Sequence, residues 1–520
     1  MKTENKKQTN STSFAKNFLN FKALRTRGFY LPNRLQVLNS YDSAGNGRRA
    51  LNWDVSDASP TSAALSGLNI LRMRSRHAIR NDAYACSAID KLVSNTIGTG
   101  ITPKPKHKDA QVRIDLQNLW DDWIEQSDSD GIYDFYGLQS LICRTMYESG
   151  ECFVRFKYAP LENNLIVPLQ LQVLEPEFIP YEKNDYAPNG NLIKAGIEFD
   201  KSGKRVAYWV YQRHPCEFEL VENGENNLIR IPADEILHIY EPTRAGQLRG
   251  VPILANVLTR LKSLDEFDDA VLFRQEVANL FAGFIHKPAP EENGIDSITG
   301  LEQEYDYDFS PMVGLEPGTM QELLPGEEVN FSSPPDAGNN YPDFMRQQLL
   351  AISAGVGIPF EVLTGDLRSV NDRVIRVVLN EFHRRIEQRQ FNVFIQQLCQ
   401  PVRQRWLDLA VLSGAVSLPS YENITQRREY LRTRWVPQGW SYIQPVQDVQ
   451  AKKMEVRCGF TSRSEVALRQ GYDAELIDAE NSEDIKRADN FGLIYETDPR
   501  LDAGLFNPPA QKDIGAKDEN

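Results

Sequence analysis

Apolar residues recur every three to four positions over residues 252–282. Gly250 precedes this pattern, and Pro252 stands where the first helical turn has no partner for a backbone N–H. Gly283 and Pro288 follow as end signals. The pattern predicts an amphipathic helix, roughly 45 Å long at about 1.5 Å per residue. Such a helix is either a central core helix or one that packs against copies of itself around a ring.

Two more segments have the same helical period, residues 341–357 and 374–412. Pro359 breaks the first, and Pro401 is a predicted kink in the second. The stretch from Arg373 to Arg405 contains seven Arg and two Glu. This basic helix has either a solvated face with intrahelical ion pairs or a face toward nucleic acid.

Strand-like alternation near a period of two occupies residues 151–240, after helical patterns over 61–97 and 110–150. The predicted strands lie in ECFVRFKY, LQLQVLEP, AGIEFD, KRVAYWVYQRH and EILHIYEP. Together these patterns predict an α+β fold with long helices. Residues 421–500 add an aromatic turn around Trp435 and Trp440, followed by amphipathic helices.

Charge is unevenly distributed along the chain. The whole chain has 58 Lys and Arg against 72 Asp and Glu, a net charge of -14, whereas residues 1–50 hold ten basic and two acidic residues. The acidic remainder is a poor clamp for phosphates, and it suits a conduit through which DNA slides. Residues 1–55 are predicted to be a disordered basic arm. This arm is either a plain tail or a segment that touches nucleic acid or a capsid partner.

Several kinds of chemistry lack support in the sequence. No apolar run reaches eighteen residues and no apolar leader is visible, so neither a membrane span nor a secretory signal is predicted. The six cysteines form no CxxC pair, no Walker A loop occurs, and Gly98–Gly100 lacks the third glycine of a dinucleotide fingerprint. Glu148, Glu151 and Glu175 have no base or metal set beside them, so we expect them to be solvated or ion-paired. No catalytic residue, metal or cofactor is predicted.

Residues 288–336 form an insertion with twelve Asp and Glu and no Lys or Arg. The spaced ligands of an EF-hand are absent from it. Pro325 and Gly326 form a predicted turn between two strand-like stretches. The insertion is either a small strand-rich subdomain with an acidic surface or a flexible acidic loop.

Five blocks of the sequence stand out, RSRHAIRNDAYACSAIDKLVSNTIGTGI, GQLRGVPILANVLTRLKSLDEFDDAVLFRQEVANLFAGFI, LEPGTMQELLPGEEVNF, ISAGVGIPFEVLTGDLRSVNDRVIRVVLNEFHRRIE and WVPQGWSYIQPVQDVQAKKMEVRCGFTSRSEVALRQGYD. These blocks resemble the lambda-like portal proteins of tailed bacteriophages. They occur in family order and cover roughly residues 60–490. One departure is visible, because many members have Asn-Tyr-Ser-Ser after a Val where this chain has Asn371, Asp372, Arg373 and Val374. A hydroxyl role at that place is therefore not carried over.

The resemblance implies a ring, commonly of twelve copies, at one vertex of the phage head, through which double-stranded DNA enters and leaves. The portal-protein fold comprises a wing, stem, clip and crown. The implied parts are the wing at 56–250, stem helices at 251–287 and 337–362, the clip at 288–336, the tunnel loop at 363–373, a basic wing or tunnel helix at 374–412, wing and crown helices at 413–500, and a disordered tail at 501–520.

The resemblance also implies sites and partners. The DNA-channel residues would be Asp366, Arg368, Asn371, Asp372, Arg373 and Arg376. The residues of the clip that dock partners would be Glu302, Glu304, Asp306, Asp308, Glu316, Glu327 and Glu328. The expected partners are further copies of the chain, the terminase large subunit, a head–tail adaptor, a major capsid or scaffold protein and double-stranded DNA, with no membrane. The expected location is the virion, after assembly in the host cytoplasm.

Two alternatives remain at this stage. The first is a portal-like component of a gene transfer agent, which would have the same fold. The second is a phage hydrolase that uses carboxylates, which predicts a monomer or dimer with clustered acids. Particle size separates a ring from such an enzyme directly.

Overall fold

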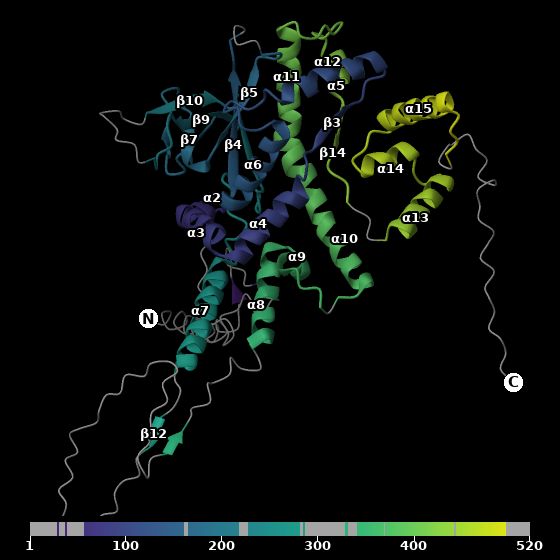
Figure 1. Ribbon diagram of the computed structural model, residues 1–520. Helices are drawn as coiled ribbons and strands as arrows, with labels where there is room; N and C mark the ends of the chain where they lie inside the picture. Colours follow the sequence, from purple (N-terminus) through teal and green to yellow (C-terminus); the bar gives the residue numbers. More distant parts are fainter. Residues whose placement is uncertain are drawn as a thin grey trace, which may run out of the picture. The chain divides into compact units, whose positions relative to one another are not determined.

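The computed structural model describes residues 57–160, 165–217, 227–280, 284–286, 328–330, 341–368, 370–440 and 444–495, with the pairs 29–30 and 37–38 (Figure 1). The chain divides into two compact units, residues 1–63 and 64–520. In the first unit, β1 (Phe29–Tyr30) pairs antiparallel with β2 (Val37–Leu38). The predicted arm and tail otherwise lie outside the described residues.

The helical pattern of residues 61–97 forms three helices rather than one. They are α2 (Pro60–Leu65), α3 (Leu68–Asn81) and α4 (Ala83–Thr96). Asp82 separates the last two because its backbone is extended and its carboxylate accepts hydrogen bonds from the N–H groups of Tyr84 (2.8 Å) and Ala85 (2.9 Å). The two predicted helices within 110–150 are confirmed as α5 (Ala110–Ile124) and α6 (Phe135–Ser149), capped by Asp109 and Asp134.

Two antiparallel sheets follow α6. One has the order β11-β4-β5, and the other has the order β10-β9-β8-β7-β6. The strands are β4 (Glu151–Tyr158), β5 (Leu169–Leu174), β6 (Asp185–Tyr186), β7 (Leu192–Lys194), β8 (Ile197–Phe199), β9 (Arg205–Tyr211), β10 (Leu228–Pro232) and β11 (Ile236–Tyr240). All five predicted strands are confirmed, and the α+β class is confirmed with them. A 3-10 helix, η4 (Pro176–Phe178), follows β5.

Two hydrophobic clusters stabilise this part of the chain. The larger one joins the helices to the three-stranded sheet and contains the aromatic group Trp120, Trp123, Phe135 and Trp406. The smaller one lies where the two sheets meet, and Phe153 of β4 and Tyr208 of β9 are both buried in it. The three-stranded sheet therefore packs against helices and also contacts the second sheet.

The predicted helix over 252–282 is shorter than expected. Residues 253–257 form turns, and the helix α7 spans Leu258–Leu280. A short antiparallel pair follows, β12 (Phe284–His286) with β13 (Glu328–Asn330), so the range 251–287 is not helical throughout. The other helix is confirmed as α8 (Tyr341–Val356), and it lies beside α7 (Figure 1). Asn256 donates to the carbonyl of Gly355 (3.0 Å), which fixes the two helices at this end.

The range 337–362 is also not a single helix. After Gly357, a five-residue helix α9 (Phe360–Thr364) intervenes, and the predicted loop 363–373 shrinks to residues 365–371. Next come α10 (Asp372–Arg389), the π-helix η5 (Gln390–Cys399) and α11 (Gln400–Leu412), so the long helix is confirmed from residue 372. Pro401 lies in the first turn of α11, and the i→i+5 bonding of η5 directly precedes this helix.

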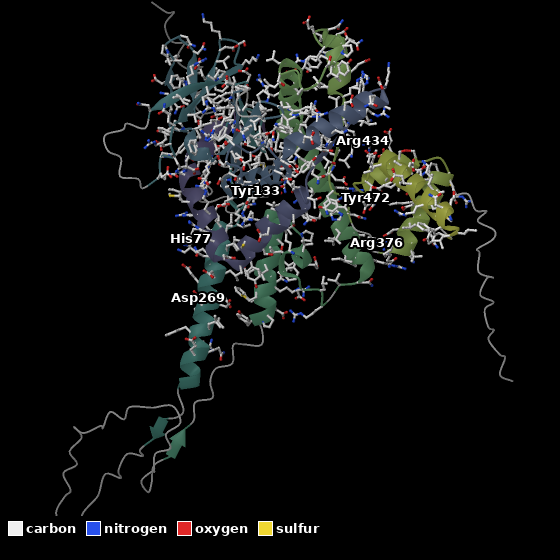
Figure 2. The ribbon with its side chains drawn as sticks, turned by 45° about the horizontal axis from the view of Figure 1, so that its top comes forward. His77, Tyr133, Asp269, Arg376, Arg434 and Tyr472 are labelled. Atoms are coloured by element: carbon white, nitrogen blue, oxygen red, sulfur yellow. The ribbon has the colours of Figure 1, made fainter. Side chains whose placement is uncertain are left out.

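The C-terminal region is not wholly helical. After α12 (Ile424–Leu431), strand β14 (Thr433–Val436) pairs antiparallel with β3 (Thr102–Pro105). Three helices follow, α13 (Pro445–Arg457), α14 (Arg463–Arg469) and α15 (Ala474–Phe491). Ion pairs join them to other elements, including Arg376–Asp448 (3.5 Å) and Arg434–Glu465 (2.8 Å). Figure 2 shows Arg376 and Arg434 on the elements next to these helices.

No described helix is both long enough and apolar enough to span a lipid bilayer.

Candidate functional site

The loop between α9 and α10 contains the first predicted channel residues. Gly365 ends α9 in the left-handed conformation (φ 73°), which a glycine adopts without strain. The guanidinium of Arg368 then donates to both carboxylate oxygens of Asp366, at 2.9 and 2.8 Å, and the Arg368 N–H donates to the same carboxylate at 3.1 Å. These hydrogen bonds lower the pKa of Asp366 well below its ordinary value. The two opposite charges therefore neutralise each other within one loop.

The remaining predicted channel residues lie at the start of α10. The side chain of Asn371 caps this helix by accepting from the N–H of Arg373 (3.1 Å). Asp372 begins the helix, and its side chain is outside the described residues. Arg373 is exposed, and Arg376 is directed to Asp448 of α13. The structure thus brings Asp366 and Arg368 together and distributes the other four along one helical turn and a half.

The arginines farther along the basic helix bind the protein itself. Arg389 pairs with Glu241 (3.1 Å), and Arg405 pairs with Asp234 (3.3 Å). Arg403 is fully buried, and its guanidinium stacks over Trp120 and Trp406 at 4.8 and 4.2 Å from the ring centroids. A face toward nucleic acid, if this helix has one, would therefore be restricted to its first half.

The predicted docking residues of the clip lie outside the described part of the chain. Glu302, Glu304, Asp306, Asp308, Glu316 and Glu327 are not described, and Glu328 is described only as the first backbone position of β13. Their role stays a prediction from the resemblance.

A buried ion-pair cluster lies where α3, β4, β11 and the segment before α7 meet. We call Glu151, Arg72, Arg249 and His238 the Glu151 cluster. The Glu151 carboxylate accepts from Arg72, from Nε of Arg249 (2.6 Å) and from the backbone N–H of Gly250 (2.8 Å). All four side chains are buried. The cluster therefore fixes the chain at residues 249–250, eight residues before α7 begins.

Arg249 makes hydrogen bonds in addition to its ion pair with Glu151. Its Nη atoms donate to the carbonyls of Ile179 (3.1 Å), Ala195 (3.0 Å) and Pro176 (3.2 Å). Gln247 binds the same segment, because its side-chain amide donates a hydrogen bond to the carbonyl of Arg249 (2.8 Å). The GQLRGVP motif thus connects the second sheet to the segment before α7 through buried hydrogen bonds.

Opposing effects set the protonation of the Glu151 cluster. Burial would raise the pKa of Glu151, but Arg249 and Arg72 outweigh it and hold this pKa well below its ordinary value. Burial lowers the pKa of His238 to about 4, against the opposite effect of Glu151. The geometry agrees, because Nη1 of Arg205 lies 3.2 Å from Nδ1 of His238 and can only donate to it. His238 is therefore neutral, and its Nε2–H points at Glu151 (2.8 Å).

This arrangement predicts that stability falls in mild acid. The folded-state pKa of His238 lies below its ordinary 6.5, so the unfolded chain binds the extra proton first. Its contribution is complete above pH 6.5 and is lost as the pH falls toward 4, by an expected total of about 3 kcal/mol, at about 1.4 kcal/mol for each pH unit between the two pKa values. Urea unfolding at pH 7, 6 and 5 measures the slope. His238→Gln, which cannot take up a proton, should flatten it, and an unchanged slope would contradict the assignment.

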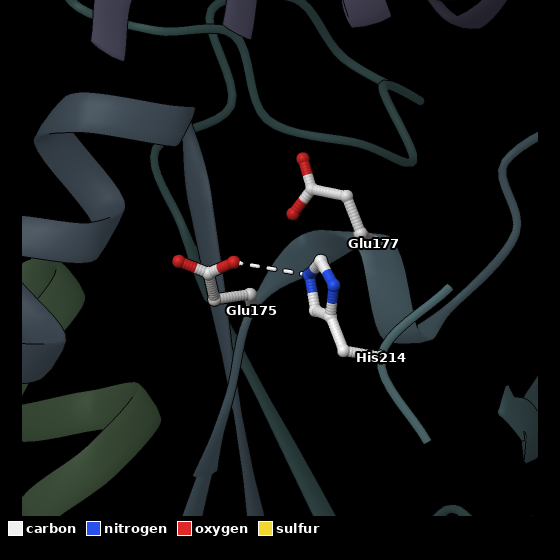
Figure 3. A group of neighbouring side chains, drawn as sticks. All are labelled: Glu175, Glu177 and His214. Carbon is white, nitrogen blue, oxygen red and sulfur yellow. Dashed lines mark ion pairs between the residues drawn. The ribbon is translucent and has the colours of Figure 1, made fainter. Parts of the chain in front are cut away.

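Glu175, Glu177 and His214 are a second group, whose ligand atoms lie within 4.8 Å of one another as a metal site requires (Figure 3). Arg76 already binds both carboxylates, with Nη1 and Nη2 at 3.1 and 3.0 Å from Glu177 and Nη2 at 3.6 Å from Glu175. The N–H of Cys216 donates to Nδ1 of His214 (3.2 Å), whereas a metal-bound histidine normally donates from its other ring nitrogen. Arg76 supplies the positive charge here, so the group is an ion-pair cluster.

Sequence reasoning missed the Glu151 cluster as a unit. Glu151 was expected to be solvated or ion-paired, and the ion pair is confirmed, but neither partner arginine was predicted. A usable signal was present in the GQLRGVP motif, where Gln247 and Arg249 stand among glycines and apolar residues that lead into a helix. Polar side chains in such surroundings are buried only when their hydrogen bonds are made.

Comparison with known proteins confirms the resemblance. Residues 46–390 match the family described as "Phage portal protein, lambda family", and the chain belongs to this family of phage portal proteins. It is 26% identical over 440 residues to the "Probable portal protein" of Halomonas phage phiHAP-1, covering 81% of each chain. It is 22% identical over 506 residues to "Portal protein B" of Escherichia phage lambda, covering 90% of each.

Among solved structures, the neck of a native GTA particle is similar at a TM-score of 0.42 and 14% identity, covering 78% of this chain and 94% of that one. Membership in the portal family makes the protein a structural component of a phage particle and implies a multimeric ring there.

Proposed function

We propose that twelve copies of this chain form a ring at one vertex of a phage head and that double-stranded DNA passes through its centre during packaging and ejection. The match of residues 46–390 to the portal family supports this proposal. The terminase large subunit drives DNA inward, and the portal ring is the passive conduit on which it docks. A head–tail adaptor later replaces the terminase on the clip, residues 288–336, while a major capsid or scaffold protein surrounds the wing. Assembly takes place in the host cytoplasm.

The surface of α7 supports packing between copies. Leu272 and Phe273 are exposed on this helix, beyond the point where Phe267 packs against Phe344 of α8. Large apolar side chains grouped on one helix are typical of a contact surface. In the ring, the α7–α8 pair of each copy would cover these residues with the pair from the next copy and form the stem.

The charge of the loop 365–371 supports a channel role. A free arginine in each copy would bind phosphates and hold DNA in place. Here Arg368 is bound to Asp366, so contact with a phosphate requires giving up this carboxylate and leaving it close to the DNA. The Asp366–Arg368 pair would therefore touch DNA without gripping it. Leu367, exposed between the two charged residues, adds an uncharged contact.

Particle size tests the ring directly. Native mass spectrometry of the purified protein should give a mass near twelve times 59.2 kDa, and electron microscopy should show a central hole. A compact single subunit, both in concentrated solution and inside assembled particles, would contradict the proposal.

The loop is tested by substitution, because a deletion of residues 363–373 would remove the buried Leu363, whose carbonyl accepts from Ser87. In Asp366→Asn, the freed Arg368 should add up to one phosphate contact per copy. We expect rings and DNA filling to persist and DNA ejection to slow at least tenfold at low salt, with a steeper salt dependence. The matched control is Asp366→Asn with Arg368→Gln, which restores the neutral loop and should eject DNA at nearly the original rate. Equal rates in all three proteins would contradict the channel assignment.

A further inference from the structure

A cleft of about 1020 Å³ lies between the C-terminal helices and the segment 436–440. Its apolar lining comes from both sides and includes Val436, Trp440, Val449, Val456 and Val466. Its charged lining consists of four cations, Lys452, Lys453, Arg457 and Arg463, and no Asp or Glu is among the described residues that form it. In a chain with a net charge of -14, this combination favours an occupant that is apolar and acidic.

The helices around the cleft are incompletely packed. None of the side chains of α13 and α14 is fully buried, although both helices have valines along the cleft. Arg463 is bound to Asp478 of α15, whereas Lys453 and Arg457 are exposed at the rim. An apolar segment inserted between these helices would complete their packing, and a carboxylate beside it would meet the two rim cations.

A segment with this chemistry begins at the last residue of α15 and continues beyond the helix. Phe491, Leu493, Ile494 and Tyr495 are all exposed, and Phe491 and Ile494 are each 75% accessible. Four large apolar side chains within five exposed residues mark a contact surface. Glu496 and Asp498 come next in the sequence. None of the four apolar residues lines the cleft of its own chain, whose lining ends at Tyr472.

We propose that residues 491–495 of one copy occupy this cleft in the neighbouring copy, with Glu496 and Asp498 of the first copy beside Lys453 and Arg457 of the second. The inference rests on the proposed ring. A head-to-tail contact of this kind repeats around a ring, because every copy offers one segment and one cleft. In Figure 1, α14 lies between α13 and α15.

The first test removes the apolar side chains of the segment. Phe491→Ser with Ile494→Ser should raise the protein concentration at which half of the rings dissociate by at least tenfold, as measured by native mass spectrometry on dilution. The matched control is Leu412→Ser with Ile424→Ser, which removes two side chains that are 82% and 70% exposed and lie away from the cleft. This control should dissociate at the concentration of the unaltered protein.

The second test identifies the cleft. A fluorescent peptide with the sequence of residues 488–498, ADNFGLIYETD, should bind full-length protein that contains the two serine substitutions, because its own segment no longer competes. Adding Lys453→Glu and Arg457→Glu to that protein should weaken peptide binding at least tenfold, and a scrambled peptide should not bind.

Three outcomes would overturn the inference. The first is equal ring stability of the serine variant and its control. The second is peptide binding without an effect of either substitution pair on ring stability, which would mean that the segment fills the cleft of its own chain. The third is peptide binding that does not depend on the rim charges, which would place the segment elsewhere. In each case the unaltered protein still forms rings, whereas failure of the proposed function would show as unaltered protein that forms none.

Discussion

Glu151→Gln is expected to lower the free energy of unfolding by about 3–5 kcal/mol, because it leaves Arg72 and Arg249 buried without a compensating charge. Glutamine has nearly the same size as glutamate, so the loss of stability results from the removed charge and not from a cavity. The carboxylate also binds the N–H of Gly250, and a glutamine amide nitrogen in the same place would face this donor. Urea unfolding at pH 7 and fixed protein concentration measures the change.

The control for this substitution is Glu175→Gln. Glu175 pairs with Arg76 at 3.6 Å and is half exposed, so its loss should cost less than about 1 kcal/mol. The ratio of the two losses in the free energy of unfolding is informative even if the absolute stability depends on assembly. Equal effects would mean that water reaches the Glu151 cluster and that the cluster does not fix the segment before α7.

Patterns with a local cause were predictable from the sequence. The helical period identifies α8 and the helix from α10 to α11, because the apolar residues of each lie on one face within a few turns. Alternation identifies the strands of the three-stranded sheet for the same reason. The β6 strand has two residues, Asp185 and Tyr186, both exposed, so it leaves no alternation to detect. The π-helix η5 is defined by its i→i+5 hydrogen bonds, which an apolar pattern does not reveal.

Features that depend on distant partners were not predictable. The members of the Glu151 cluster come from positions 72, 151, 238 and 249, and no spacing along the chain relates them. The helix predicted from residue 252 does not begin there, because residues 253–257 form non-helical turns. In this segment the N–H of Ile253 donates a hydrogen bond to the carbonyl of Tyr147 (3.1 Å). Tertiary contacts with the end of α6 thus decide where α7 begins.

The loop 365–371 shows a third kind of limit. The sequence places Asp366 and Arg368 in a polar loop, and the family resemblance assigns that loop to the channel. Their mutual ion pair depends on the backbone turn after Gly365, which brings the two side chains to the same side. The sequence shows only that the loop contains charges of both signs. The structure shows that the charges of Asp366 and Arg368 neutralise each other.

Gly250→Ala is expected to destabilise the protein by about 3 kcal/mol, at the upper end of what overpacking costs. A Cβ atom at this position would lie 2.0 Å from the carbonyl oxygen of Gly150 and 2.6 Å from its carbonyl carbon. Both are backbone atoms at the junction of α6 and β4, where Gly150 itself has a φ of 91° and would place its own Cβ against Val251. Relief therefore requires the two chain segments to separate.

Separation would also move the N–H of Gly250 away from Glu151, from which it lies 2.8 Å. The substitution should consequently weaken the Glu151 cluster and change the position of α7, so a loss of ring assembly is expected together with the loss of stability. Gly67→Ala is the matched control, because no atom lies within 4 Å of its Cβ position and its φ of -138° suits any residue. Urea unfolding and native mass spectrometry measure the two effects. If Gly250→Ala behaves like Gly67→Ala in both, the close approach of residues 150 and 250 does not hold α7 in place.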